Sequence, residues 1–393
     1  MGMGQETRQV HRFPCHDCGE DVVVALCVDY EKITHWVEEV ENAEWIEEVI
    51  GAPIVNVDAN FIVPKEQRHL DFVFPRMEHL QERFKIAEKN GSVVEAPVEE
   101  LDSGKWRERP YRRPDYEEEW KLLKTTWSLH RRGREHLVGD RLKSASEVYY
   151  ASDPLASIQD WLWRFTMFFS QPAYESPFQA SFDRIRPLLK SKEFGRFREH
   201  YNKISDERAE RYFELFRSYF ESYDQFSQVH FDVAQGIEIP DGNMASSVDF
   251  GSVKMFYGNT FEASSSSVDI LAYFSNLIAG RQFDEFQNLK LKDYLRLDKL
   301  GRFGPLAAVP EFDGLFSERD NQLRNASHHG GTRLDVKNQL ITFQSGKGGQ
   351  GQTKEIGYAK YLARCDKIFL QMVVLFRLEI MLCQVSNGLK WPI

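Results

Sequence analysis

Large apolar side chains recur three or four residues apart in two long segments of the chain. One segment carries Trp161, Leu162, Phe165, Phe168 and Phe169, and the other carries Phe213, Phe216, Phe220 and Phe226. This spacing gathers them on one face of an α-helix, as a stripe that has to be buried. The total of 29 Phe, 15 Tyr and 8 Trp favours broad interfaces between helices over a single thin sheet. The sequence therefore predicts a mainly α fold in which these stripes are core and not a cofactor-binding motif.

The composition shifts about three times along the 393 residues, a length that is enough for two or three domains. We expect a small N-terminal α+β region over residues 1–100, a basic and aromatic connector with helices over 101–240, and a C-terminal helical bundle over 241–393. The net charge of −10 argues against a protein that coats nucleic acid without specificity, because such proteins carry a basic surface. A local basic patch is still compatible with this charge.

The N-terminal region contains two β-like runs of small and branched apolar residues, over residues 21–28 and 52–57. Residues 30–50, between them, are rich in glutamate and place Trp36, Val37, Val40 and Trp45 at helical spacing. We predict a solvated amphipathic helix there.

The sequence CHDCG at residues 15–19 resembles one knuckle of a zinc ribbon. A structural zinc ion needs four ligands, but no second CxxC follows Cys15 and Cys18. The residues left to complete a set are His11, His16, Cys27 and His35. We expect a zinc-ribbon-like turn without its metal, and a structural zinc at Cys15 and Cys18 is the alternative.

The five cysteines do not form a disulfide framework in a chain of this length, which favours a reducing cytoplasm. The N-terminus has no apolar leader segment, and the longest apolar stretch, residues 368–381, is shorter than a membrane span and carries Arg377 and Glu379. We expect a soluble cytoplasmic protein with no membrane contact. Cys365 and Cys383 fall at apolar helical positions and are expected to be core thiols, not nucleophiles.

Residues 105–143 reverse the charge of the chain, with twelve Lys or Arg against seven acidic residues. Aromatic residues are interleaved with the basic ones, namely Trp106, Tyr111, Tyr116, Trp120 and Trp127. Basic residues among aromatics suit single-stranded nucleic acid, because they combine phosphate contacts with base stacking. RNA contacts are accordingly predicted at Arg112, Arg113, Arg131 and Arg132. The alternative is a connector whose aromatic residues are packing anchors.

The C-terminal region reads as four helices, over residues 252–279, 283–300, 313–330 and 358–384, with a hairpin-like insert before the last. The third ends in Arg324-Asn325-Ala326-Ser327-His328-His329 and is stopped by glycine at 330. Histidine exchanges protons near neutral pH, and arginine grips phosphate through its planar fork. This combination points to phosphodiester chemistry.

This motif, late in a helical bundle, resembles the RNxxxH signature of the HEPN superfamily, and the likeness covers residues 249–386. It implies a bundle that dimerises and cleaves RNA without a metal or other cofactor, leaving a 2′,3′-cyclic phosphate and a 5′-hydroxyl. By the same resemblance His329 is the general acid or base, Arg324 holds the phosphate, and Asn325 orients the histidine or the phosphate. A toxin or antiphage effector, with an antitoxin or regulatory protein as partner, is also implied.

Helix geometry leaves the choice of histidine open. At about 100° per residue Arg324 shares a face with His328, whereas His329 shares one with Asn325. If the site forms across a dimer, the arginine of one chain can meet the histidine of the other. We expect His329 to be catalytic, with His328 as its rival.

The glycine-rich run at residues 347–353 resembles a deviant phosphate loop, but the forty residues after it cannot build the parallel sheet that such a loop needs. We expect a glycine-rich hairpin beside the active site, with Lys347 in contact with RNA. Two other functions remain open, a noncatalytic HEPN module for dimerisation or RNA binding and a regulatory partner of a nucleotidyltransferase.

Overall fold

The computed structural model describes residues 7–15, 18–29, 34–46, 62–67, 116–245, 250–328, 331–344, 351–386 and 388–393. It confirms a mainly α fold with a small N-terminal region that contains strands. The two predicted apolar stripes are core, because Phe165, Phe169, Phe216 and Phe226 are fully buried.

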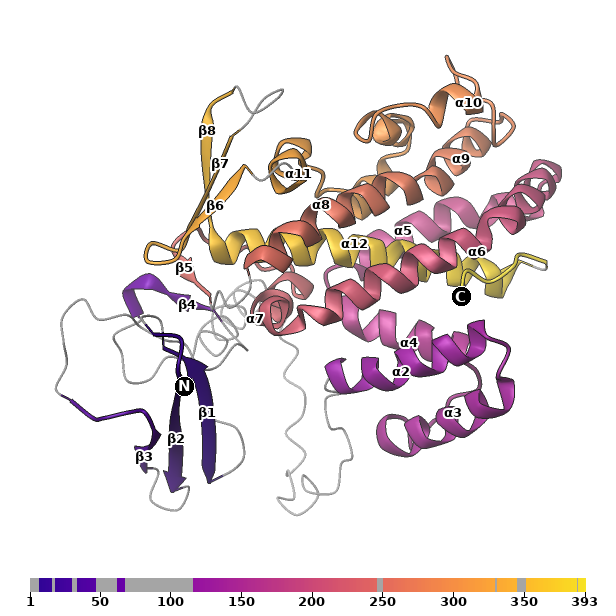
Figure 1. The fold of residues 1–393 in the computed structure, drawn as a ribbon. Helices are drawn as coiled ribbons and strands as arrows, with labels where there is room; N and C mark the ends of the chain where they lie inside the picture. The colour runs from indigo at the N-terminus through magenta and orange to yellow at the C-terminus, as the bar shows by residue number, and fades with distance from the viewer. Residues whose placement is uncertain are drawn as a thin grey trace, which may run out of the picture.

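The helices of the middle region precede and surround the last helix of the chain (Figure 1). They are α2 (Tyr116–Arg131), α3 (Glu135–Tyr149), α4 (Ile158–Ser170), α5 (Glu175–Ile185), the 3-10 turn η3 (Arg186–Lys190), α6 (Lys192–Glu221) and α7 (Tyr223–Ala234). Serine residues start two of them, since Ser157 accepts the Asp160 amide and Ser191 accepts the Phe194 amide.

The last helix, α12 (Tyr358–Val385), runs through the centre of the molecule and packs against α4, α7 and α8 (Figure 1). By length and composition it could cross a membrane, but 83% of its most apolar window is buried inside the protein. Arg377 and Glu379, two buried charges of this helix, both have ion-pair partners. The Arg377 guanidinium bonds Glu175 at 2.7 Å, and Arg208 donates from Nε to Glu379 at 2.9 Å. Cys365 and Cys383 are buried in the same helix, as predicted.

The N-terminal strands β1 (Arg8–Pro14), β2 (Asp21–Asp29) and β3 (Thr34–Glu41) form an antiparallel sheet in the order β1-β2-β3. The predicted strand at 21–28 is confirmed, and the predicted helix over 30–50 is wrong where the structure describes it. β3 pairs with β2 through backbone hydrogen bonds. Arg8 and Arg12 on β1 form ion pairs of 2.9 and 3.2 Å with Glu38 and Glu41 of β3. These cross-strand contacts outweigh a helical spacing that few residues support. Residues 52–57, predicted as a strand, lie outside the described residues.

The zinc-ribbon-like turn joins β1 to β2, with backbone hydrogen bonds from the Cys15 amide to the Glu20 carbonyl (2.7 Å) and from the Gly19 amide to the Cys15 carbonyl (2.9 Å). Its residues 16 and 17 are not described. In the parts of the chain that are, no three His, Cys, Asp or Glu side chains gather into a metal site.

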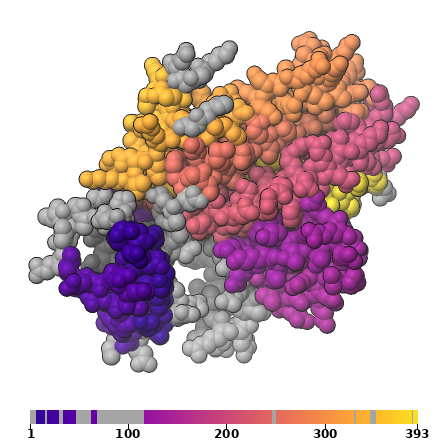
Figure 2. Space-filling view, in the orientation of Figure 1, coloured from indigo at the N-terminus to yellow at the C-terminus, as the bar shows by residue number. Residues whose placement is uncertain are grey.

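One short strand pairing connects residues 63–64 to the helical body. β4 (Val63–Pro64), which is followed by the 3-10 turn η1 (Lys65–Gln67), pairs with β5 (Asn243–Met244). Figure 2 shows the helices of the middle and C-terminal regions merging into one body, with the N-terminal strands beside it.

The C-terminal region begins with α8 (Phe250–Ser267) and α9 (Asp269–Ile278), close to the predicted first helix. The predicted second helix over 283–300 is wrong, because only α10 (Leu291–Tyr294) is helical there. The Asn276 side chain captures the Phe283 carbonyl at 2.8 Å, and Phe286 turns inward to stack on Tyr294. Two 3-10 turns follow, η4 (Gly301–Ala308) and η5 (Pro310–Leu315).

The predicted insert before the last helix is an antiparallel sheet of β6 (Thr332–Asp335), β7 (Leu340–Gln344) and β8 (Thr353–Gly357). It stands beside the short helix α11 (Asn321–His328), above the first turns of α12 (Figure 1).

Candidate functional site

The motif helix α11 begins eight residues later than predicted, at Asn321. Residues 310–315 form the 3-10 turn η5, and Asp320 then starts the helix by accepting the Gln322 and Leu323 amides at 2.8 and 3.0 Å. Burial by itself would raise the pKa of Asp320, but the Leu323 amide and the Arg364 guanidinium offset it and lower that pKa.

The first turn of α11 is tied to both neighbouring helices by a buried carboxylate, Glu318. Its Oε1 atom accepts hydrogen bonds from the Tyr257 hydroxyl of α8 (2.6 Å) and from the Arg364 guanidinium of α12 (2.6 Å). Arg364 also bonds the Asp320 carboxylate at 3.1 Å. Bonds to charged groups in a buried setting are stronger than neutral ones, so this cluster fixes where α11 starts.

A second attachment lies near the end of the helix. The buried Ser327 hydroxyl donates to the Leu323 carbonyl at 2.9 Å and lies 3.3 Å from the Tyr361 hydroxyl. Tyr361 in turn donates to the Lys254 carbonyl of α8 at 3.2 Å. Leu323 and Ala326 are buried as their spacing predicted, so Ser327 is a packing residue of the motif.

The remaining face of α11 meets α8 in two contacts that are one helical turn apart on both helices. Arg324 forms an ion pair with Glu262, and the His328 ring lies against Gly258. Because residue numbers rise along α8 as they fall along α11, the two helices are antiparallel here. Arg324 and His328 therefore share one face, and that face is directed at α8.

Arg324 is held on two sides. Its Nη2 donates to Glu262 Oε1, and its Nη1 donates to Asn325 Oδ1 at 2.7 Å. The other oxygen of Glu262 pairs with Lys299 Nζ at 2.7 Å. About a quarter of each of the Arg324 and Glu262 side chains is exposed, so this ion pair is partly shielded from water and still reachable.

Two nitrogen atoms of this pair have no hydrogen-bond partner among the described residues, Nε of Arg324 and Nε2 of His328. Both atoms are shielded by the surrounding side chains. An imidazole nitrogen without a partner is available to give or take a proton, and a guanidinium N–H without one is available to an anion.

Because Gly258 has no side chain, the His328 ring can lie close to the backbone of α8. A Cβ atom at this position would lie 2.5 Å from Cδ2 and from Nε2 of the His328 ring. Neither Gly258 nor Glu262 nor Lys299 was expected from the sequence to belong to the site. The only signal was the spacing of four between Gly258 and Glu262, which matches that between Arg324 and His328.

Of the predicted RNA contacts, the structure describes Arg131 and Arg132. Arg112, Arg113, Lys347 and His329 lie outside the described residues. Arg131 pairs with Glu210 and lies over the Phe213 ring at 5.1 Å, and both it and Arg132 are at the end of α2, across α12 from α11 (Figure 1). Arg131 and Arg132 are therefore separate from the α11 site, and their contact with RNA stays a prediction.

Two of the interleaved tryptophans of this basic segment, Trp120 and Trp127, are core residues. Trp120 stacks on Phe220 with ring centroids 5.0 Å apart, and Trp127 stacks on Phe376 at 5.5 Å. Both indoles are buried and cannot stack on bases. The alternative, that these aromatics are packing anchors, is confirmed for these two.

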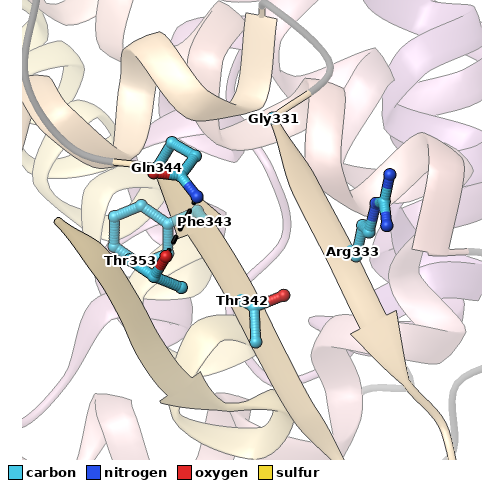
Figure 3. A pocket seen from close by; sticks show the side chains of 6 residues that line it. All are labelled: Gly331, Arg333, Thr342, Phe343, Gln344 and Thr353. Atoms are coloured by element: carbon cyan, nitrogen blue, oxygen red, sulfur yellow. Dashed lines mark hydrogen bonds between the residues drawn. The ribbon is translucent and has the colours of Figure 1, made fainter. Parts of the chain in front are cut away.

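A shallow hollow of about 380 Å³ opens on the sheet beside the end of α11 (Figure 3). It is lined by Gly331, Arg333, Thr342, Phe343, Gln344 and Thr353, four of which have polar side chains. Gln344 Nε2 donates to Thr353 Oγ1 at 2.9 Å, which leaves the amide oxygen of Gln344 as an acceptor. Lys354 of β8 bonds the Gln322 side chain at 2.6 Å and so fixes this sheet against α11.

The site thus combines a shielded cation, an unpartnered histidine nitrogen and an adjoining polar hollow. Compared with protein families, with curated proteins and with solved structures, the chain finds no match.

Proposed function

We propose that α11 and its contact with α8 form the active site of a metal-independent endoribonuclease of the HEPN type. One observation carries the proposal: Arg324 and His328 lie on the same face of α11, each with a shielded nitrogen that lacks a partner among the described residues. Phosphodiester cleavage without a metal needs a general acid or base next to a fixed cation. The polar hollow beside α11 supports the proposal, since it offers room for a nucleotide.

In the reaction we propose, the histidine nitrogen takes the proton of the ribose 2′-hydroxyl. The 2′-oxygen then attacks the neighbouring phosphorus, the P–O5′ bond breaks, and the leaving 5′-oxygen takes up the proton that the histidine removed from the 2′-hydroxyl. The products are a 2′,3′-cyclic phosphate and a 5′-hydroxyl. Arg324 stabilises the negative charge that builds on the phosphate oxygens, and Asn325 holds the guanidinium through the 2.7 Å bond.

The position of His328 supports it as the histidine of this reaction, because it faces α8 together with Arg324. His329 remains the alternative, as the residue to which the HEPN motif assigns the role. A homodimer through the helical bundle would let the two histidines take different roles, one in each protomer. We further propose a cytoplasmic toxin or antiphage effector, controlled by an antitoxin or regulatory protein.

The ion pair between Arg324 and Glu262 favours a second candidate function. A guanidinium already bound to a carboxylate stabilises the charge of a transition state less well, so the same face also suits a noncatalytic module that binds RNA or a regulatory partner without cleavage.

Cleavage of a single-stranded RNA in the presence of EDTA tests the proposal. We expect Arg324→Ala and either His328→Ala or His329→Ala to lower the rate by about 10² to 10⁴. His136→Ala, an exposed histidine of α3, is the matched control and should cleave like wild type. Product ends other than cyclic phosphate, or equal rates in all four variants, would refute the assignment. Binding of RNA without cleavage by wild type would favour the second candidate.

A further inference from the structure

Three more basic side chains lie around the carboxylate that holds Arg324. Lys299, which precedes η4, pairs with Glu262 at 2.7 Å. Arg302 in η4 donates to the Leu295 carbonyl at 2.6 Å. Arg211 of α6 reaches the Ser267 hydroxyl at the end of α8, at 3.3 Å. Arg211 is about 90 residues away in sequence from Lys299 and Arg302, so the sequence alone does not group the three.

The charges of this cluster are not balanced within it. Burial and the neighbouring Arg302 and Arg211 guanidinium groups lower the pKa of Lys299. Four cations, counting Arg324, face two carboxylates, Glu262 and the Glu207 that pairs with Arg211 at 2.6 Å. The Nε atoms of Arg302 and Arg324 have no acceptor within the described part of the chain. Like charges brought together in a partly buried place favour an incoming anion.

The cluster also has a direction. Along α8 the His328 contact is at residue 258, the Arg324 and Lys299 contacts are at 262, and the Arg211 contact is at 267. At 1.5 Å per residue these levels are separated by about 6 and about 7.5 Å. The Lys299, Arg324 and Arg211 side chains are each between one fifth and two fifths exposed, so solvent reaches all three.

We infer that this row of cations is a phosphate-binding track, which holds the backbone of single-stranded RNA on one side of the scissile phosphate. We call it the α8 track, and define it by Arg324, Lys299, Arg302 and Arg211. The inference rests on the proposed function, since it places the substrate relative to the α11 site. The chain as a whole has a net charge of −10, which repels RNA, so holding RNA beside α11 needs a local group of cations such as the α8 track.

The test measures binding and not cleavage. The affinity of a 2′-O-methyl oligoribonucleotide of about twelve nucleotides, which cannot be cleaved, is measured at several salt concentrations. For a single strand, each lost phosphate contact lowers the slope of log affinity against log salt by about 0.7. We expect this change for Lys299→Gln and for Arg211→Gln. Arg186→Gln removes an equal charge just before the start of α6, about 29 Å along that helix from Arg211, and should keep the wild-type slope.

An unchanged slope in both Lys299→Gln and Arg211→Gln, an equal change in Arg186→Gln, or no binding by wild type would overturn the α8 track. Thermal unfolding of each variant confirms that it is folded, and two independent substitutions guard against the loss of one variant. The outcome is separate from the fate of the proposed function. If the slopes fall as expected but the protein never cleaves RNA, the α8 track is supported and the proposed nuclease function is refuted. If the protein cleaves RNA and the slopes are unchanged, the nuclease function is supported and the α8 track is refuted.

Discussion

Gly258→Ala tests the contact on which the choice of histidine depends. The added Cβ would lie 2.5 Å from the His328 ring, whereas ordinary contacts begin at 3.4 Å, so the ring must move by about 1 Å. A misplacement of this size can cost about 10²-fold in rate, or about 2.7 kcal/mol of transition-state stabilisation. We expect the single-turnover cleavage rate of Gly258→Ala to fall by about that factor while the protein stays folded.

Gly139→Ala is the matched control. Gly139 lies inside α3, and a Cβ there meets nothing within 4 Å. Alanine is the better helix former by about 0.8 to 1.0 kcal/mol, so this variant should be slightly more stable than wild type and cleave at the same rate. A cleavage rate within about threefold of wild type in Gly258→Ala would contradict a catalytic role for His328 and leave His329 as the candidate.

Three further predictions concern the core. Trp127→Ala should lower the free energy of unfolding in urea by about 3 to 5 kcal/mol, because the indole is fully buried, and a loss below about 1 kcal/mol would contradict its role as a packing anchor. Burial raises the pKa of Glu119, so the folded state holds this proton more tightly than the unfolded chain, and the stabilisation present at low pH is lost as pH rises through the folded pKa. Glu119→Gln keeps an acceptor for the Tyr150 hydroxyl and should be more stable than wild type near pH 7, with the difference shrinking towards pH 4; a constant difference in urea titrations at the two pH values would refute this. Cys18 is exposed and should react with a maleimide in the native protein, whereas the buried Cys365, whose pKa burial raises, should react only after unfolding, as mass spectrometry of labelled peptides can show.

The helical part of the fold was predictable where one face of a segment is uniformly apolar. The spacing of Phe165 and Phe169, and of Phe216 and Phe220, identified α4 and α6 as core helices. The prediction for residues 30–50 failed because four apolar residues can be read as a helical stripe, whereas β2 offered backbone pairing along β3. The prediction for residues 283–300 failed where the Asn276 side chain donates a hydrogen bond to the Phe283 carbonyl, which in a helix would accept a backbone amide.

The candidate site was only partly predictable. The motif supplied Arg324, Asn325 and the two histidines, and helix geometry showed that Arg324 and His328 share a face. Which helix that face meets depends on contacts between residues about 60 positions apart in sequence, as between Glu262 and Arg324. No local pattern reports such contacts. The same limit applies to the basic segment. Its composition favoured a nucleic-acid-binding surface, but Trp120 and Trp127 are buried in the core.

The sequence by itself determined that the chain is mainly α, that its last long helix is a core element, and that Arg324 and His328 share one face of the helix before it. These features are local, because the period of an α-helix and the position of its stop residue depend on residues within a few turns of each other. Tertiary structure decided that α11 starts at Asn321, that its reactive face meets Gly258 and Glu262 of α8, and that Lys299, Arg302 and Arg211 gather beside it. The physical reason is that α11 has only eight residues and is too short to be stable alone, so the buried bonds from Tyr257 and Arg364 to Glu318 set its position.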